Sequence, residues 1–255
     1  MLHRIKSLHG LSIGATDGDI GRIEDVYFDD QRWAVRYLIA DTGGWLGGRQ
    51  VLISPFSVTG IGWDSKTVRV RLRRQQVQDS PGIDTDMPVS RRSEADFRRY
   101  YGYPDYWGGP LLWGATAYPF FDLGAPVPPI EAEREREAAQ ASDQHLLSAS
   151  EVAGYGIQAS DDSIGHLDDL LFEAESWAVR YIVVDTRNWW PGRRVVIPPQ
   201  WIERMDWPEH QVKVGVSRDQ VKAAPEFDPA GAPSREYEER LHAHYARQGY
   251  WRDPR

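Results

Sequence analysis

Residues 20–55 read IGRIEDVYFDDQRWAVRYLIADTGGWLGGRQVLISP, and residues 164–199 read IGHLDDLLFEAESWAVRYIVVDTRNWWPGRRVVIPP. The two stretches are copies of one another at a constant shift of 144 residues. The same shift aligns residues 2–107 with residues 146–251 without a gap and gives 36 identities in 106 positions. A repeat of this kind indicates that one structural unit has been duplicated.

The repeat predicts the domain organisation. We predict two domains of one kind, at residues 1–107 and 146–255, because a copy of this length is long enough to bury its own core. Residues 108–145 join them. This segment begins rich in proline, glycine and apolar residues and continues with charged helix formers, so we predict a linker whose second part is helical.

Within each copy the hydrophobic pattern is mostly that of β-strands. Residues 34–41, AVRYLIAD, are nearly all apolar, which is typical of a strand buried on both faces. Residues 68–73, VRVRLR, alternate strictly, so Val68, Val70 and Leu72 are expected to face inward. So many short strands and tight turns favour a mainly β fold of two small β-barrels. Further strands are expected at 13–16, 21–28, 50–53 and 58–63.

A short helical tail is predicted after each barrel. One or two helical turns are expected at residues 74–78 and 218–223. A second helix follows in each copy, and in the second copy Tyr237, Leu241 and Tyr245 recur at helical spacing. This apolar stripe should pack on a barrel.

Composition excludes several classes of protein. The chain has no Cys, which rules out a disulfide scaffold, thiolate catalysis and Cys-ligated zinc and fits a reducing compartment. The formal net charge of −8 argues against general nucleic-acid binding. The N-terminus lacks the apolar run of a secretory signal, and the most apolar stretch, residues 110–130, holds five prolines. We therefore expect a cytoplasmic protein without a transmembrane segment.

The duplicated stretch resembles the PRC-barrel domain family. The resemblance rests on an Ile-Gly pair near the second strand, on the pattern V-R-Y-L-I-x-D, and on a G-R-x-V-x-I-P strand, each present in both copies in this or a closely similar form. It implies a barrel like those of the photosynthetic reaction-centre H subunit and of the C-terminal domain of a ribosome-maturation factor. The tails resemble those of a bacterial subgroup of stand-alone PRC-barrel proteins. The resemblance implies a protein-interaction or assembly module, and leaves RNA or ribosome association and a membrane-complex role as alternatives.

Aromatic residues on one loop are candidates for partner binding. In the second copy this loop carries two adjacent residues, Trp189 and Trp190, which cannot both point into the core of one strand. Tryptophan is a frequent anchor of protein interfaces. Trp45 lies at the matching position of the first copy, in a glycine-rich loop that lacks the Lys-Ser/Thr of a phosphate-binding loop. We predict a protein partner or a homo-oligomer that uses these residues.

A basic stripe is the second candidate surface. Arg69, Arg71 and Arg73 point to one face of the last strand of the first copy, where the second copy has Lys213, Gly215 and Ser217. An anionic partner would explain this difference. The alternatives are a solvated outer face, or salt bridges to the acidic residues of the linker at 131–137.

An Asp-Thr pair ends the buried strand in both copies, and an Arg follows eight positions after the Asp. A carboxylate at the end of a strand can cap the N–H groups of the following loop or pair with the Arg across the hairpin. We predict the second role, with structural ion pairs of Asp41 with Arg49 and of Asp185 with Arg193. A catalytic Asp would need a second carboxylate, a His or a metal nearby, and the sequence offers none at a suitable spacing.

No catalytic, cofactor or metal site is predicted. The pattern G-x-S-x-G at residues 10–14 lacks the preceding strand of a hydrolase elbow, and Gly156 replaces its Ser in the second copy. The aspartates at 17, 19, 161, 162, 168 and 169 match no calcium-binding loop and are interpreted as turn residues. His242 and His244 are two positions apart on a predicted helix and face apart.

Overall fold

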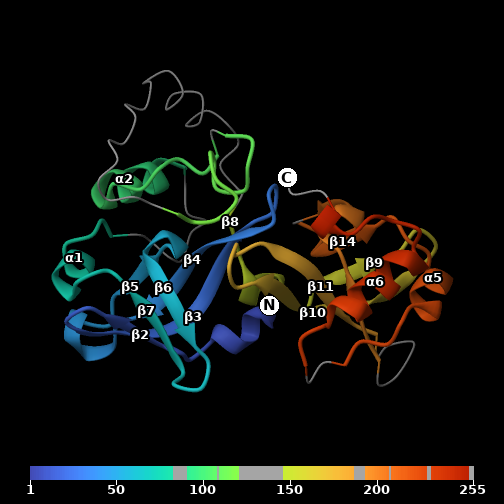
Figure 1. The fold of residues 1–255 in the computed structure, drawn as a ribbon, viewed down its shortest axis with the longest axis horizontal. Helices are drawn as coiled ribbons and strands as arrows, with labels where there is room; N and C mark the ends of the chain where they lie inside the picture. Colours follow the sequence, from blue (N-terminus) through green and yellow to red (C-terminus); the bar gives the residue numbers. More distant parts are fainter. Residues whose placement is uncertain are drawn as a thin grey trace. The chain divides into compact units, whose positions relative to one another are not determined.

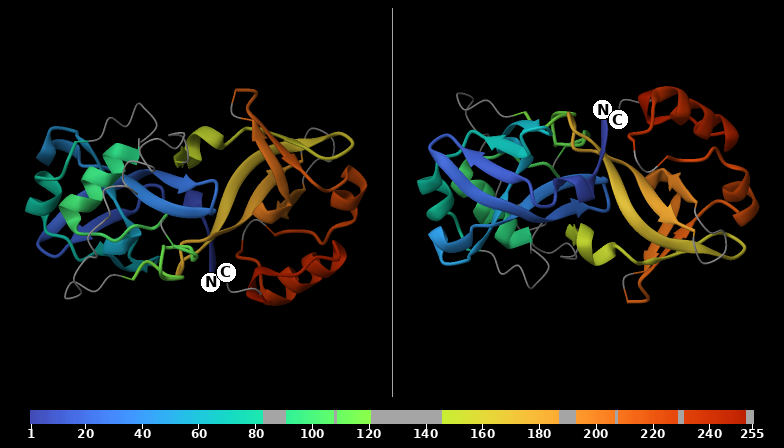
Figure 2. Two further views of the ribbon diagram at one scale, coloured as in Figure 1. Left: turned by 90° about the horizontal axis from the view of Figure 1, so that it is seen from above. Right: turned by 90° about the horizontal axis from the view of Figure 1, so that it is seen from below.

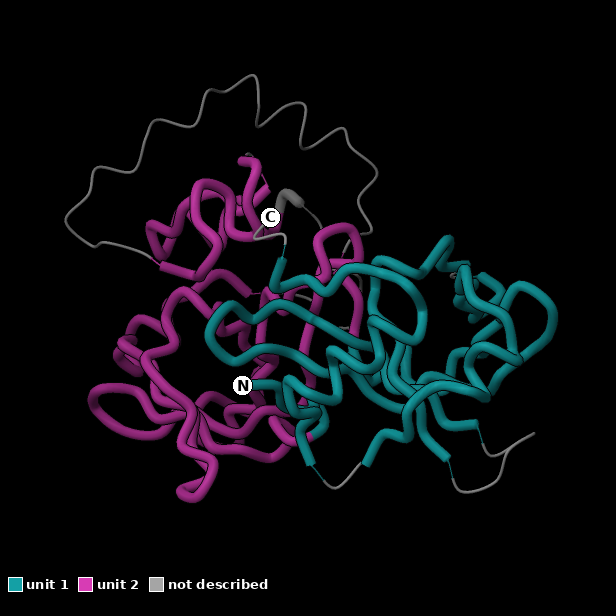
Figure 3. Tube along the Cα trace, turned by 45° about the vertical axis from the view of Figure 1, so that its right-hand side comes forward, with its two compact units in different colours: residues 1–6, 149–255 teal, residues 7–148 magenta. Residues whose placement is uncertain are grey.

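A computed structural model of the chain describes residues 1–82, 91–107, 109–120, 146–186, 193–206, 208–228 and 231–252. The chain divides into two compact units (Figure 3). Unit 1 consists of Met1–Lys6 and Ala149–Arg255, and unit 2 consists of Ser7–Ser148. Each unit contains one seven-stranded sheet (Figure 1), which confirms the prediction of a mainly β protein with two barrel-type domains.

Unit 2 contains most of the first copy. Its sheet has the order β5-β4-β3-β2-β7-β6, in which β2 and β7 are parallel and all other neighbours are antiparallel. The strands are β2 (Ser12–Ala15), β3 (Gly18–Asp29), β4 (Ala34–Asp41), β5 (Gln50–Ile53), β6 (Val58–Gly62), β7 (Thr67–Val70) and β8 (Leu146–Ser148). The helical segments are η2 (Gly43–Leu46), η3 (Pro55–Ser57), α1 (Arg74–Gln78) and α2 (Arg91–Tyr101).

Unit 1 repeats this topology as β12-β11-β10-β9-β14-β13. Its long pair β10–β11 is the twisted yellow-to-orange ribbon of Figure 2. The strands are β1 (Leu2–Arg4), β9 (Gly156–Gln158), β10 (Ser163–Glu173), β11 (Val179–Asp185), β12 (Arg194–Ile197), β13 (Ile202–Asp206) and β14 (Gln211–Val214). The helical segments are α4 (Ala149–Val152), η4 (Pro199–Trp201), α5 (Arg218–Ala223), α6 (Arg235–His244) and η5 (Tyr250–Arg252), and η1 (Ile5–Leu8) spans the boundary between the units.

Two features of the duplicated motif have a direct structural cause. A Cβ atom on Gly21 would lie 2.0 Å from the carbonyl oxygen of Asp41, and one on Gly165 would lie 2.0 Å from that of Asp185. The glycine of the Ile-Gly pair is therefore required, because the carbonyl group at the end of β4 or β11 approaches it too closely for a side chain. Trp33 has a positive φ of 53° in the turn before β4, and its ring packs 5.7 Å from that of Phe28.

The strand and helix predictions hold in detail where the pattern is strong. β4 and β5 have the predicted bounds. In β7 and the three residues after it, Val68, Val70 and Leu72 are buried while Arg69 and Arg73 are exposed. The helical turns predicted at 74–78 and 218–223 are α1 and α5.

Two strands were not predicted. β1 and β8 are the first strands of the two copies, and each lies in the unit that contains the rest of the other copy. The predicted boundaries at 107 and 146 are those of the sequence repeat. The compact units have other boundaries, because each unit contains the first strand of the other copy. Residues 109–120 of the predicted linker are part of unit 2, and the helical part predicted at 131–137 lies outside the described residues.

A buried glutamate fixes each tail helix to its own sheet. In unit 2, Tyr37 of β4 and Tyr106 after α2 both donate their hydroxyl hydrogen bonds to Glu94 Oε1, at 3.0 and 2.5 Å. Glu94 is 1% exposed. The tail therefore packs on the barrel, as predicted, and this polar contact explains why both tyrosines and the glutamate recur in the second copy.

Unit 1 repeats the arrangement with Tyr181, Tyr250 and Glu238. The two hydroxyls donate to Glu238 Oε1 at 3.0 and 2.8 Å. Burial raises the pKa of Glu238, and the hydrogen bonds from Tyr250 and Tyr181 oppose this shift. The predicted stripe of Tyr237, Leu241 and Tyr245 is buried beside it.

Replacement of Glu238 by Gln should be tolerated, and replacement by Ala should not. Gln keeps an acceptor for both hydroxyls, so Glu238→Gln should change the free energy of unfolding by no more than about 1 kcal/mol. Glu238→Ala leaves two buried hydroxyls without that acceptor and should cost about 2–4 kcal/mol. Because the pKa of Glu238 is raised, the stabilisation that Glu238 contributes to the wild type declines as the pH rises through the folded-state pKa. The Gln variant does not titrate at this position, so it should lose less stability than the wild type over that interval. Urea denaturation at several pH values measures both effects, and equal losses in the two variants would contradict the assigned role.

Candidate interaction site at the exchanged strands

The exchanged strands fill the free part of a sheet edge. One edge of β10 pairs with β9 at Ser163–His166, and the same edge pairs with β1 at Leu171–Glu173. In unit 2, β2 pairs with the first part of β3, and β8 pairs with residues 27–29 of β3. An unpaired edge presents free N–H and C=O groups to any strand that can add to it. We call the edge of β10 at Leu171–Glu173 the β10 slot and the edge of β3 at residues 27–29 the β3 slot.

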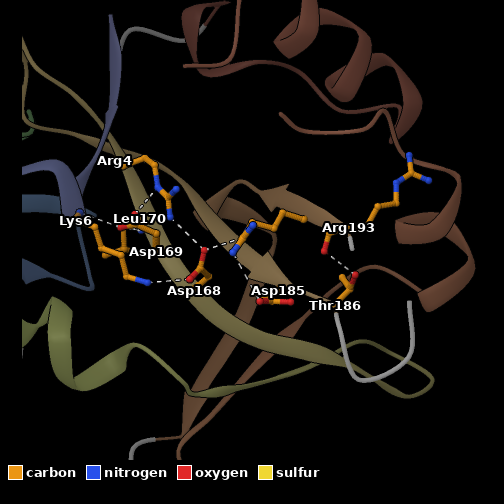
Figure 4. Close-up of polar contacts among 9 residues, drawn as sticks. Arg4, Lys6, Asp168, Asp169, Leu170, Asp185, Thr186 and Arg193 are labelled. Atoms are coloured by element: carbon orange, nitrogen blue, oxygen red, sulfur yellow. Dashed lines mark hydrogen bonds and ion pairs between the residues drawn. The ribbon is translucent and has the colours of Figure 1, made fainter. Parts of the chain in front are cut away.

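The strand in the β10 slot is held by charges (Figure 4). Arg4 Nε lies 2.7 Å from Asp169 Oδ2, and a second guanidinium nitrogen lies 3.2 Å from Asp168. Lys6 Nζ lies 2.8 Å from Asp168 Oδ1, and the backbone N–H of Lys6 donates to Asp169 Oδ1 at 3.2 Å. Arg194 of β12 lies 3.0 Å from Asp168 on its other side. The two aspartates therefore bind the incoming strand. The prediction that they are turn residues was wrong.

Burial gives these contacts their importance. The side chain of Asp169 is 2% exposed, and burial raises its pKa while the hydrogen bond from Arg4 opposes the shift. Burial also disfavours the charged form of Asp168, but the hydrogen bond from Lys6 and the charges of Lys6, Arg194 and Arg4 prevail and lower its pKa. A carboxylate buried to this degree needs a cationic partner. In this structure the exchanged strand supplies it.

The β3 slot has different chemistry. The strand that enters it brings Ser148, whose hydroxyl donates to Asp25 Oδ2 at 2.5 Å. Gln50 stands where the second copy has Arg194, and its amide lies 2.6 Å from Glu24. Acidic residues thus occur at the same positions in both slots. Among the described residues, only the segment that enters the β10 slot brings two cationic side chains, those of Arg4 and Lys6.

A half-buried carboxyl group lies next to the β3 slot. Asp30 Oδ1 has no hydrogen-bond partner among the described residues, and burial together with the charge of Asp29 raises the pKa of Asp30 to about 6. The protonated form favours folding, so this contribution is complete below about pH 4 and is lost as the pH rises through 6. The second copy has Ala174 at this position.

The variant Asp30→Asn should be more stable than the wild type above pH 6 and equally stable near pH 4. Asn removes the buried charge, and we expect a gain of about 1 kcal/mol because partial exposure screens the charge. Thermal unfolding from pH 4 to pH 8 measures the difference between the two proteins. A difference that does not change with pH would refute this assignment.

The structure places Trp45 against its own unit. The indole N–H donates to the carbonyl oxygen of Ile20 at 2.5 Å, and the guanidinium of Arg74 stacks 4.3 Å from the ring centre. Trp45 is half-buried, so part of its ring remains accessible. Trp189 and Trp190 lie outside the described residues. Arg69 and Arg73 are exposed and Arg71 is half-buried, so the predicted basic stripe exists as a surface, while its predicted acidic linker partner is outside the described residues.

The residues of the predicted ion pairs have different partners. The guanidinium of Arg49 donates to the carbonyl oxygens of Gln78 and Ser80, at 3.1 and 2.7 Å, and Asp41 accepts from the N–H of Gly43. The hairpin is closed instead by Thr42, whose hydroxyl donates to the carbonyl oxygen of Arg49 at 2.6 Å. Thr42, which follows Asp41, is close enough to bond directly to the backbone of the opposite strand. This hydrogen bond takes the place of the predicted ion pair.

The second copy shows the same substitution of partners. Thr186 Oγ1 donates to the carbonyl oxygen of Arg193 at 2.9 Å (Figure 4). Arg193 lies 3.7 Å from Glu226, and Asp185 has Arg194 at 3.9 Å. The repeated Asp-Thr pair therefore has a structural role in which the threonine makes the conserved cross-hairpin bond in both copies.

Two arginines that sequence reasoning missed hold the first part of the linker. Arg36 of β4 is 1% exposed, pairs with Asp29 at 3.1 Å, and donates to the carbonyl oxygen of Leu112 at 2.9 Å. Arg32 donates to the carbonyl oxygens of Trp107, Gly109 and Leu111. For Arg36, the sequence signal was an arginine inside a strand that is otherwise apolar, at the same position in both copies.

Among the described residues, no group of three or more His, Cys, Asp or Glu side chains is arranged to hold a metal ion. None of the helices in the described ranges is long and apolar enough to cross a membrane.

Comparison with known protein families gives one match. The PRC-barrel domain matches residues 2–72, from β1 to just after β7. The barrel part of the first copy is therefore similar to a PRC-barrel domain. The matched range includes β1, which belongs to unit 1. The rest of the matched range, from Ser7 onward, belongs to unit 2. The assignment of the second copy rests on the internal repeat and on its matching sheet. A search of curated proteins finds no match.

A PRC-barrel domain suggests an interaction or assembly module in general, and PRC-barrel domains are generally non-catalytic.

Proposed function

We propose that this protein is a non-enzymatic assembly module, in which two PRC-type barrels on one chain bind partner proteins or further copies of the chain. The observation that carries the proposal is the strand exchange. The chain already uses strand addition at the two slots to complete each barrel. In the β10 slot, Arg4 and Lys6 of the added segment pair with Asp168 and Asp169. A barrel completed in this way joins two structural units without a catalytic group, as an assembly module requires.

The residues proposed to contact a partner are those whose side chains are not needed for the exchange. They are Trp45, Trp189 and Trp190 on the loops after the central strands, and Arg69 in β7 with Arg71 and Arg73 just after it. Tryptophan and arginine are enriched among residues that dominate binding energy. The half-buried position of Trp45 and the exposure of Arg69 and Arg73 support this assignment.

The double variant Trp189→Ala/Trp190→Ala tests the proposal. Affinity purification of the tagged full chain from its host, compared with the wild type, should show the loss of the same specific partner or of self-association. The variant Trp63→Ala, which removes one of the tryptophans on neither loop, is the matched control. An unchanged partner set and an unchanged oligomeric state in the double variant would end the proposal for this loop.

The exposed residues Arg69 and Arg73 support a second candidate, association with RNA. Arg69 lies in β7 and Arg73 lies three residues after its end, and both would contact phosphates. Filter binding in a salt series distinguishes the candidates, because phosphate contacts make the affinity fall steeply with salt. Binding that weakens with salt and is reduced by Arg69→Ala/Arg73→Ala would favour RNA, and the absence of salt-dependent binding would exclude it.

A further inference from the structure

The β10 slot can be described as a binding site for a short basic strand. Three residues of β1 are in register with β10, Leu2 with Glu173, His3 with Phe172, and Arg4 with Leu171. The backbone N–H of Ala174 extends the ladder by donating to the carbonyl oxygen of Met1 at 3.2 Å. The backbone pairing gives affinity for any strand, while the side chains that flank it give selectivity.

Selectivity in this slot comes from charge. The aspartates Asp168 and Asp169 lie at one end of the slot, and each is bound by a cation of the incoming strand. The strand β8, which enters the β3 slot, has Ser148 at the position of Arg4 and Ser150 at the position of Lys6. If β8 entered the β10 slot, it would leave the buried carboxylate of Asp169 without the cation that Arg4 provides. The slot therefore discriminates between the two first strands of the chain.

The strand is also short and connected at one end to the other unit. The chain leaves unit 1 after Lys6 and enters unit 2 at Ser7. Release of the few residues before this point frees the β10 slot without opening the core of unit 2. Every copy of the chain carries the same strand and the same slot, so a strand from a second chain would recover the same ladder and ion pairs.

We infer that the β10 slot accepts the N-terminal strand of a second copy of this chain, and that the protein forms a strand-exchanged dimer through this slot. The occupant is the segment Leu2–Lys6, and the acidic pair Asp168–Asp169 selects it. The inference deepens the proposed assembly function by naming one partner, a second copy, and one contact. It does not involve the tryptophan loops, so its failure leaves the proposed role of those loops to be decided by their own variants.

Cysteine cross-linking between chains tests the inference, since the natural chain has no Cys. One full-length chain carries His3→Cys, and a second, distinguishable by a tag, carries Phe172→Cys. Residues opposite one another in an antiparallel ladder have Cα atoms about 4.5–5.5 Å apart, within the range that a disulfide can bridge. The matched control replaces Phe172→Cys by Phe28→Cys, the corresponding position on the β3 slot, which is equally buried.

After the two chains are mixed at high concentration and oxidised, the 3–172 mixed disulfide should exceed the 3–28 mixed disulfide at least about tenfold. Its yield should rise with protein concentration, and Arg4→Glu in the donor chain should lower it to the level of the control. Equal yields at the two positions, or no mixed disulfide at any concentration, would overturn the inference.

A second pair keeps the test independent of the folding of Phe172→Cys. Leu2→Cys in one chain and Glu173→Cys in the other report the same entry of β1 into the β10 slot, because Leu2 lies opposite Glu173 in the ladder. A dimer that exchanges β1 should therefore give the 2–173 mixed disulfide as well as the 3–172 one. The absence of the 2–173 disulfide from a sample in which both chains fold would count against the dimer.

Discussion

The variant Arg36→Ala should destabilise the protein by about 3–5 kcal/mol, one of the two largest effects that we expect from a single substitution. Arg36 is 1% exposed and its side chain pairs with the buried carboxylate of Asp29. Its guanidinium also stacks 3.9 Å from the ring centre of Tyr106 and 4.7 Å from that of Trp113. Alanine would leave Asp29 as a buried charge without this cation and would remove the contact with the carbonyl oxygen of Leu112. Urea denaturation measures the loss.

The second copy provides the matched control. Arg180 occupies the same position, pairs with Glu173 at 2.8 Å and stacks 4.1 Å from Tyr250, but its side chain is 23% exposed. Arg180→Ala should therefore cost about 1 kcal/mol. If Arg36→Ala and Arg180→Ala cost the same, burial would not be the reason for the importance of Arg36.

The variant Trp113→Ala should cost about 3–5 kcal/mol, although Trp113 lies in a segment that the sequence marks as a linker. Its side chain is 1% exposed. The ring contacts Phe56 edge-on at 4.9 Å and lies 6.3 Å from Tyr106, so alanine would open a large cavity beside η3. Differential scanning calorimetry should show a lower unfolding temperature.

Tyr118→Ala is the control for Trp113, because Tyr118 belongs to the same segment and is 56% exposed. It should change the stability by less than about 0.5 kcal/mol. Arg36 and Trp113 are in contact, so the double variant should lose less than the sum of the two single losses. Additive losses would contradict a shared cluster.

The local pattern of the sequence predicted most of the fold. The apolar run at Ala34–Asp41 and the alternation from Val68 to Leu72 correspond to β4 and to β7 with the residues that follow it, because both signals reflect burial within a few neighbouring residues. The repeat predicted two sheets of the same topology. The tail helix packs by the predicted stripe, which is again a local pattern.

The exchange of first strands could not be predicted in this way. β1 has three residues, too few to show a period, and its partners on β10 are more than 160 positions away, as the contact of Arg4 with Asp169 shows. Two copies with the same topology offer each first strand two possible slots, and the choice depends on chain connectivity and on side-chain charge. Asp168 and Asp169 were assigned to turns because their cations are distant in sequence.

The candidate site was predicted only in part for a similar reason. Arg69 and Arg73 point outward, as the alternation of β7 requires, whereas the partners of Arg49 depend on where the chain after α1 lies. Arg36 could have been recognised as a buried cation, since it interrupts an apolar run at the same position in both copies. Two of its partners, Leu112 and Trp113, come from the linker, which has no counterpart in the repeat.

Disulfide trapping within a single chain tests most directly whether each copy is completed by the first strand of the other. His3→Cys/Phe172→Cys and His3→Cys/Phe28→Cys, both in the full-length chain, are oxidised at low protein concentration and analysed by mass spectrometry after digestion. The exchange predicts a disulfide between residues 3 and 172 within one chain and little or none between residues 3 and 28. A disulfide that forms between residues 3 and 28 and not between 3 and 172 would contradict it.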